Sequence, residues 1–265
     1  MTTSVHASEL KNVPAPSLPQ DDLGIDRAFI MQMAQVPFIA LGLMLLAFLS
    51  HILWQQFSSS EEALRNLGPV VVVCIGMIVA AIIDGWAFKV PNWLTLSLVI
   101  SGWGLGLCHD LGIAIDAGSG GLGSALVCTI MGFFLLFPML AIGGMGQGDV
   151  KMQMGFGAWI GAYFGGQDGV EILVIAFCAG AIVGGIFGLI MMILRRQFGE
   201  NAGNFKEIFR DLRVMTTMGP AAAAQRANQR RPKWVRLPYG VPLCVGFVGY
   251  LAYLAWQHSQ ILMHS

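Results

Sequence analysis

Long apolar blocks with almost no charge constrain this chain more than any other feature of its sequence. The block PVVVVCIGMIVAAII, for example, runs up to Asp84 without a charged residue. A stretch of about 18 or more apolar residues is long enough to cross about 30 Å of hydrocarbon. Charged residues make up 11% of the 265 residues, whereas a soluble domain carries about 25%. The chain is therefore expected to be an integral membrane protein.

The apolar blocks predict an all-α fold, a polytopic membrane helical bundle of about seven transmembrane helices. Backbone groups inside lipid must pair internally, so each block is expected to be helical. The 34 glycines fit this class, because small residues let membrane helices approach one another closely. The expected spans are 28–54, 68–83, 93–109, 121–142, 150–165, 172–194 and 240–257.

The remaining composition argues against a signal peptide, a metal and a cofactor. Residues 1–27 are polar and contain proline, so we expect a disordered tail. The first span is too long for the apolar region of a secretory signal. The cysteines stand singly, without C-x-x-C spacing, so neither a zinc site nor a disulfide framework is expected. Each is expected to be a small buried hydrophobe: Cys74, Cys108, Cys128, Cys178 and Cys244.

Lysine and arginine placement predicts the orientation, because cytoplasmic loops carry an excess of both. With seven spans the loops alternate, and 14 of the 15 basic residues fall on the side of the N-terminus. Only Arg65 lies on the other side, which includes the expected loop 166–171. The segment 195–236 carries ten Lys and Arg against three acids. We interpret it as a cytoplasmic loop that rests on anionic lipid rather than as a binding site.

Two acidic residues lie at the ends of expected spans on the cytoplasmic side. Asp84 ends one span, and Asp149 follows the glycine-rich GGMGQG and begins another. Acids at such depths are costly and are usually functional. Two adjacent carboxyls share one proton near neutral pH, so one can take a proton from water while the other donates to a peptide carbonyl. Peptide hydrolysis by this pair needs a water and no metal.

Simpler roles stay open from charge placement alone. Asp149 could be only a helix N-cap, and Asp84 could be a solvated residue at the membrane interface. The glycines before Asp149 could be only a flexible turn. Helix-end acids are common, so these alternatives and the catalytic one stand about level at this point.

Three ordered motifs resemble those of the prepilin peptidase (type IV leader peptidase) family. The stretch Asp84–Thr95, DGWAFKVPNWLT, resembles its D-x-x-x-x-x-I-P-N-x-L-T segment. The stretch Gly146–Lys151, GQGDVK, resembles its G-x-G-D-x-K segment, and Leu237–Val241, LPYGV, resembles its closing P-[YF]-G. A lone G-x-G-D is a weak signal, but three ordered matches are specific.

The resemblance implies a six-helix aspartyl peptidase core over 68–257 that cuts the leader of type IV pilin-like precursors at the cytoplasmic face. Asp84 and Asp149 take the places of the catalytic aspartates. The supporting motif positions are Gly146, Gly148, Lys151, Pro91 and Asn92. Lys151 could stabilise a carboxylate charge or anchor the topology, whereas Pro91 and Asn92 look like turn and helix-start residues.

The chain departs from the long bifunctional members of that family, because it lacks their two C-x-x-C pairs. It looks like the short, peptidase-only class that serves tight-adherence (Flp-type) pili, with 28–54 as an additional N-terminal transmembrane helix. The implied setting is a bacterial inner membrane with the N-terminus in the cytoplasm. The implied partners are membrane lipid and a prepilin with a basic leader and an apolar helix, with no nucleic acid.

Two other functions stay open on the sequence. A transporter or channel could use the two aspartates to move protons or ions, although no inverted repeat is visible and no acid lies near mid-membrane. The chain could also be a non-catalytic scaffold for pilus assembly, in which case replacing either aspartate would leave function intact.

Overall fold

The computed structural model describes residues 27–57, 66–87, 90–113, 118–141, 145–194, 213, 217 and 238–264. Almost all of the expected tail and of the basic loop 195–236 lies outside these ranges. The described residues form an all-helical bundle, which confirms the predicted fold class. Its long helices are α1 (Arg27–Phe57), α2 (Gly68–Ala87), α3 (Asn92–Asp110), α4 (Leu122–Ala141), α5 (Gln147–Phe164), α6 (Gly166–Leu194) and α9 (Gly240–His264).

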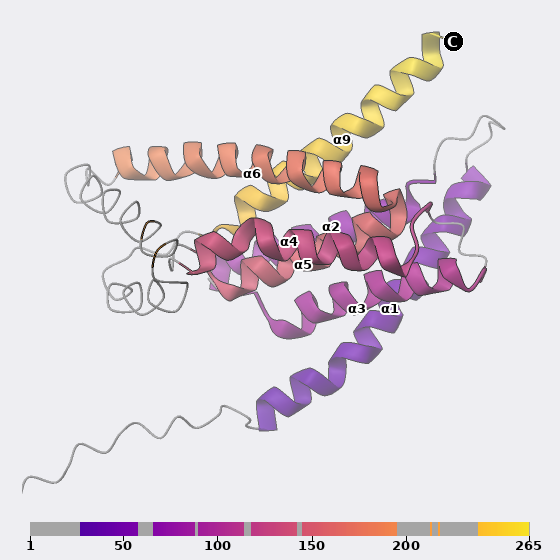
Figure 1. Ribbon diagram of the computed structural model, residues 1–265, viewed down its shortest axis with the longest axis horizontal. Coiled ribbons are helices and arrows are strands. Elements are labelled where there is room, and N and C mark those ends of the chain that lie inside the picture. The colour runs from indigo at the N-terminus through magenta and orange to yellow at the C-terminus, as the bar shows by residue number, and fades with distance from the viewer. Residues whose placement is uncertain are drawn as a thin grey trace, which may run out of the picture.

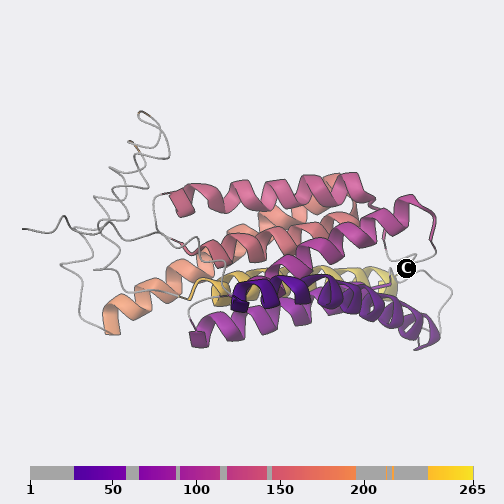
Figure 2. The ribbon, with the colours of Figure 1, turned by 90° about the horizontal axis from the view of Figure 1, so that it is seen from below.

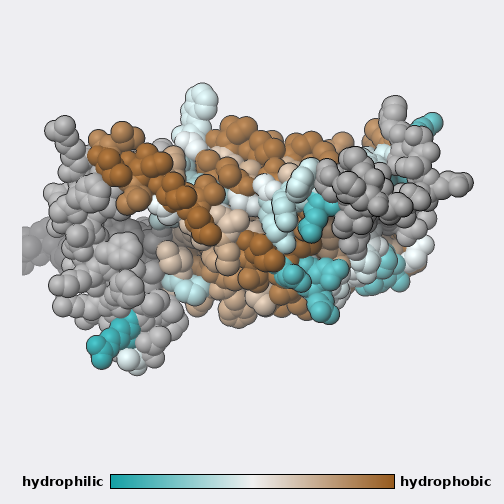
Figure 3. All heavy atoms as spheres, turned by 90° about the horizontal axis from the view of Figure 1, so that it is seen from above, coloured by the Kyte–Doolittle hydropathy of each residue, from teal (hydrophilic) through white to brown (hydrophobic). Residues whose placement is uncertain are grey.

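Most of the helices run along one direction (Figures 1 and 2), and α1 and α9 cross that direction obliquely in the view of Figure 1. Within the part of the chain that the structure describes, five helices are long and apolar enough to span a membrane, namely α1, α2, α4, α6 and α9. Their outward side chains are large and apolar, as expected for contact with lipid, and such side chains cover the middle of the face seen in Figure 3. The chain is a multi-pass membrane protein.

The helix α5 lies at the centre of the bundle, which explains why it is less apolar than its neighbours. Thirteen of its 18 residues are buried, and it packs against α2, α3, α4 and α6. Its Phe156 also meets Phe247 of α9, with 3.9 Å between the ring centroids. A helix surrounded by protein does not need lipid-facing side chains, so α5 can carry glycine and polar residues.

Glycines bring α4 and α5 almost into backbone contact. A Cβ atom on Gly157 would lie 2.4 Å from the carbonyl oxygen of Cys128, and one on Gly161 would lie 2.4 Å from that of Ser124. On α4, a Cβ on Gly132 would lie 2.8 Å from the carbonyl oxygen of Gln153. No larger residue fits at these positions without moving a helix.

Two details of the sequence-based description are wrong. The expected loop 166–171 does not form, because α6 already begins at Gly166 and only Gly165 separates it from α5. Gly165 has a φ of 88°, a conformation open to glycine that lets the chain reverse within one residue. Cys178 is exposed rather than buried, whereas Cys128 and Cys244 are buried as expected.

The additional N-terminal helix α1 is an integral part of the bundle. It packs along α3 and α2, and the Ser97 hydroxyl of α3 donates a buried 3.1 Å hydrogen bond to the carbonyl oxygen of Val36. At the far end of α1, Asn66 donates a 2.8 Å bond to the carbonyl oxygen of His51. α1 therefore covers a large part of α3.

Candidate active site

Asp84 lies in the last turn of α2, which continues beyond the expected span to Ala87. The residue is 5% exposed. Its Oδ2 accepts a buried 2.9 Å hydrogen bond from the backbone N–H of Gly240, the first residue of α9. The carboxyl therefore lies at the N-terminus of α9, where the helix dipole favours negative charge.

Only glycine leaves room for Asp84 at position 240. A Cβ atom there would lie 2.8 Å from Asp84 Oδ2 and 3.0 Å from Asp84 Cβ. The next residues pack in the same way, because a Cβ on Gly85 would lie 3.5 Å from the Val241 side chain. The closing P-Y-G motif therefore forms one wall around the first aspartate.

Asp149 is the third residue of α5 and follows an N-cap at Gly146. Its Oδ2 accepts a 3.2 Å hydrogen bond from the Gly146 backbone N–H. Asp149 therefore caps its own helix from inside the first turn, rather than from the N-cap position that the simpler interpretation gave it. The residue is 5% exposed, and its Oδ1 is buried without a hydrogen-bond partner among the described residues.

The fold brings the two aspartates together although 65 positions separate them in the sequence. The two carboxyls lie near enough for the Asp84 charge to act on Asp149, and the Asp149 charge in turn acts on the phenol of Tyr239. Burial and the nearby Asp149 charge raise the pKa of Tyr239. The phenol is therefore a neutral group, able to donate a hydrogen bond, near Asp149.

The remaining motif residues join the helix starts of α3 and α5. The Lys151 ammonium donates a 2.8 Å hydrogen bond to Asn92 Oδ1. Pro91 is the N-cap of α3 and Asn92 its first residue, as their sequence context indicates. A Cβ on Gly148 would lie 3.2 Å from Val90. The V-P-N and G-x-G-D-x-K motifs thus pack directly against each other, and Lys151 links them through an amide.

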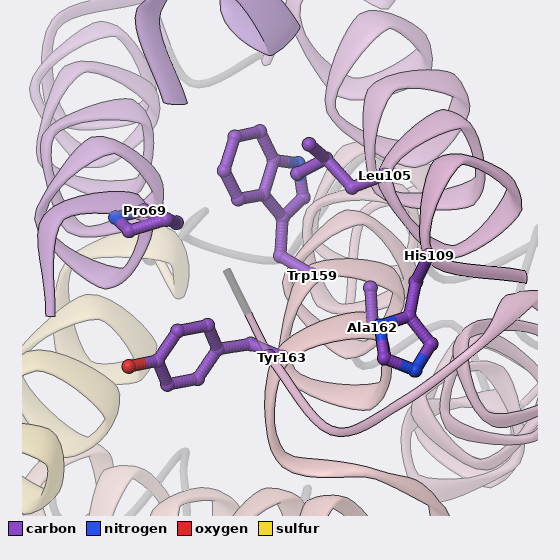
Figure 4. Close-up of a pocket in the computed structure, with 7 residues that line it drawn as sticks. Pro69, Leu105, His109, Trp159, Ala162 and Tyr163 are labelled. Atoms are coloured by element: carbon purple, nitrogen blue, oxygen red, sulfur yellow. The ribbon is translucent and has the colours of Figure 1, made fainter. Parts of the chain in front are cut away.

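A small hollow among the described residues lies at the opposite end of the bundle from the aspartates. It is lined by residues near the start of α2 and the end of α5, whereas the aspartates lie at the end of α2 and the start of α5. Trp159 and Tyr163 form its floor between Pro69 on one side and Leu105 and His109 on the other (Figure 4). It contains no pair of acids and does not compete with the dyad as a candidate site.

The buried carboxyl pair and its motifs agree with the comparison with known proteins. Residues 71–189 match the model of the type IV leader peptidase family. The region from α2 to α6 is therefore similar to that family. This similarity supports a membrane-embedded prepilin leader peptidase, with a prepilin as its substrate, as the function to be proposed for the chain. No curated protein and no solved structure gives a significant match.

The match places α2 to α6 inside the leader peptidase family model and leaves α1 and α9 outside it. The α9 helix nevertheless supplies Gly240 to the site. Sequence reasoning identified P-Y-G as a motif without a role, and it overlooked Gln153 altogether. A glutamine in an apolar stretch, one helical turn after Asp149, is a signal that could have drawn attention to it.

Proposed function

We propose that the chain is a prepilin leader peptidase, an aspartyl endopeptidase whose catalytic residues are Asp84 and Asp149. The observation that carries this proposal is the burial of both carboxyls within electrostatic reach of each other, each with a backbone N–H on one oxygen. Two buried carboxyls whose charges interact cannot both ionise cheaply, so the proposal assigns the pair one proton near neutral pH. Such a pair has one general base and one general acid ready.

The reaction follows from that single shared proton. The charged carboxylate takes a proton from a water molecule as the water oxygen attacks the scissile carbonyl carbon. The protonated carboxyl gives its proton to the carbonyl oxygen, which yields a tetrahedral diol. When the carbon–nitrogen bond breaks, the carboxyl that took the proton from water gives that proton to the leaving nitrogen, and one hydroxyl of the diol returns a proton to the other carboxylate. The new ends are an acid and an amine, and the dyad again holds one proton.

The substrate proposed is a Flp-type prepilin with a basic leader, cut at the cytoplasmic face of a bacterial inner membrane. Both aspartates lie at helix ends, so the scissile bond would be met at the rim of the bundle. The pilin's apolar helix would remain in lipid beside the helices. The absence of C-x-x-C pairs from the sequence supports a peptidase-only activity, and metal-independent hydrolysis follows from the dyad chemistry.

Leader cleavage in a peptidase-deficient bacterium tests this proposal. The chain is co-expressed with a Flp-type prepilin, and Asp84→Asn and Asp149→Asn are compared with wild type at matched membrane levels. Asp168→Asn is the matched control, because Asp168 is an exposed acid in the first turn of α6. We expect the mobility shift to vanish in both dyad variants and to persist in the control.

Three results would contradict the proposal. Cleavage that survives Asp84→Asn or Asp149→Asn would mean that the catalytic pair is wrong. Failure of a well-folded wild type to cut several Flp-type prepilins would rule out that substrate class. A methylated product would contradict the peptidase-only assignment, and the mass of the product tests this directly.

A further inference from the structure

Gln153 is a fully buried polar residue that the dyad chemistry described above does not use. Its exposure is 0%, and neither Nε2 nor Oε1 has a hydrogen-bond partner among the described residues. Burying an amide without partners is costly, and buried polar groups in native proteins nearly always have one. A leucine or methionine would fill the same space without that cost, so the amide itself requires a reason.

Gln153 lies one helical turn after Asp149, on the same face of α5. Gly157 and Gly161 meet α4 at Cys128 and Ser124, and Gln153 meets it at Gly132. These α5 positions are spaced by four, so they share one face of the helix, and Asp149 is the next position on it. Helical side chains lean toward the N-terminus. The Gln153 side chain therefore leans toward the turn that carries Asp149.

Asp149 also has a carboxyl oxygen without a hydrogen-bond partner among the described residues. Its Oδ2 accepts the Gly146 N–H, but its Oδ1 is buried and has no partner among the described residues. Two unpartnered polar side chains, one turn apart on one buried face, supply the polar contacts that an internal water requires. Asp84 is engaged elsewhere, through its own bond to Gly240.

We propose that Gln153 is a positioning residue for Asp149 and acts through one internal water. The Gln153 Nε2–H donates to the water oxygen, and the water donates to Asp149 Oδ1. This bridge would fix the carboxyl from the side opposite Gly146, with both oxygens held by donors. The inference rests on the proposed function, because it assigns Gln153 a role in the geometry of that same dyad.

The test uses the full-length enzyme in nanodiscs with a purified prepilin, comparing Gln153→Met and Gln153→Asn with wild type. Methionine keeps the length of the side chain and removes the amide, whereas asparagine keeps an amide that a water can still reach. Met152→Leu is the control for packing, because Met152 is equally buried on α5. The values measured are kcat, KM and the thermal midpoint Tm.

We expect Gln153→Met to lower kcat about ten-fold with KM within two-fold, while Tm stays unchanged or rises because an unpartnered buried amide is gone. Gln153→Asn should recover at least a third of the wild-type kcat, and Met152→Leu should stay near wild type. Wild-type kcat in Gln153→Met would overturn the inference. So would losses of kcat and Tm together in both Gln153 variants, which indicate packing alone.

Failure of this inference differs from failure of the proposed function. If Asp84→Asn or Asp149→Asn still cleaves, the dyad assignment itself is wrong, whatever Gln153 does. If both are inactive and Gln153→Met is fully active, the dyad stands and the positioning role of Gln153 is wrong.

Discussion

The two aspartates of the candidate active site are held by different means. Asp149 is held within its own helix start, because its Gly146 partner lies three residues earlier in the same turn. Asp84 is held across the fold, because its Gly240 partner lies 156 residues later at the start of α9. The first contact forms whenever α5 forms, whereas the second requires α9 to pack correctly against α2.

This difference shows that the two halves of one site can have unequal tolerance to change. A local cap moves with its helix, so a small change beside Asp149 shifts the donor and acceptor together. The position of the Asp84 carboxyl depends on two separate helices, α2 and α9, that must meet at a fixed distance. A shift of about 1 Å in catalytic geometry can lower the rate about 100-fold. The position of the Asp84 carboxyl should therefore be more sensitive to substitutions than that of Asp149.

The largest effect that sharpens this comparison is expected from Gly240→Ala. Its Cβ would lie 2.8 Å from Asp84 Oδ2 and 3.1 Å from Asp84 Cγ, so either the carboxyl or α9 must move. We expect the single-turnover rate constant for prepilin cleavage to fall about 100-fold. The measurement is single-turnover leader cleavage by purified enzyme, at equal amounts of folded protein.

The control for this variant is Gly249→Ala on the same helix. A Cβ on Gly249 meets nothing within 4 Å among the described residues, and alanine favours helix more than glycine does. Gly249→Ala should retain wild-type cleavage. A Gly240→Ala enzyme that cuts at a rate near wild type would refute the view that Asp84 depends on a close approach of α9.

The sequence alone predicted the helices and the dyad because both leave strong local signals. Uncharged blocks identify the membrane helices, and acids at the block ends identify Asp84 and Asp149. The P-N-x-L-T and G-x-G-D-x-K patterns then narrow the chemistry. A single sequence does not predict which helix lies at the centre, since α5 is distinguished by what surrounds it.

The contacts between distant segments could not be predicted for the same reason. The pairing of Asp84 with Gly240 and of Lys151 with Asn92 depends on how whole helices pack. The expected loop 166–171 was wrong because the sequence does not show that Gly165 alone reverses the chain. The segment 166–171 contains Val170 among its polar and glycine residues, and its sequence is equally compatible with the start of a helix.

A smaller effect, on stability, is expected from breaking the hydrogen bond that links Lys151 on α5 to Asn92 on α3. Lys151 and Asn92 are half-buried and lie 2.8 Å apart between Nζ and Oδ1. Net contributions of hydrogen bonds to charged groups are about 1.5–3 kcal/mol. A double-mutant cycle of Lys151→Met and Asn92→Ala should therefore show a coupling of about 1.5 kcal/mol in unfolding free energy, measured by denaturant titration in mixed micelles.

The matched comparison for this cycle combines Lys151→Met with Asp110→Asn. Asp110 lies at the other end of α3, where its Oδ2 accepts the Leu122 N–H at 2.9 Å. These two changes share no partner and should add. Additive free energies for Lys151 and Asn92 as well would show that the bond between the two motifs contributes nothing to stability.

The smallest effect is expected from Gly146→Ala, which tests the local contact between Gly146 and Asp149 directly. Gly146 has a φ of −80°, which alanine adopts readily, and the added Cβ would lie 3.3 Å from Asp149 Oδ2. The donor N–H remains, so kcat should fall no more than about three-fold. This is in keeping with the few tenths to about 1 kcal/mol that separate glycine from alanine at an N-cap.

Gly146→Pro is the comparison for this variant. Proline fits the same φ but deletes the N–H, so Gly146→Pro should lower kcat more than Gly146→Ala does. If Gly146→Ala lowered the cleavage rate as much as Gly240→Ala, the local contact of Asp149 would tolerate substitution no better than the long-range contact of Asp84.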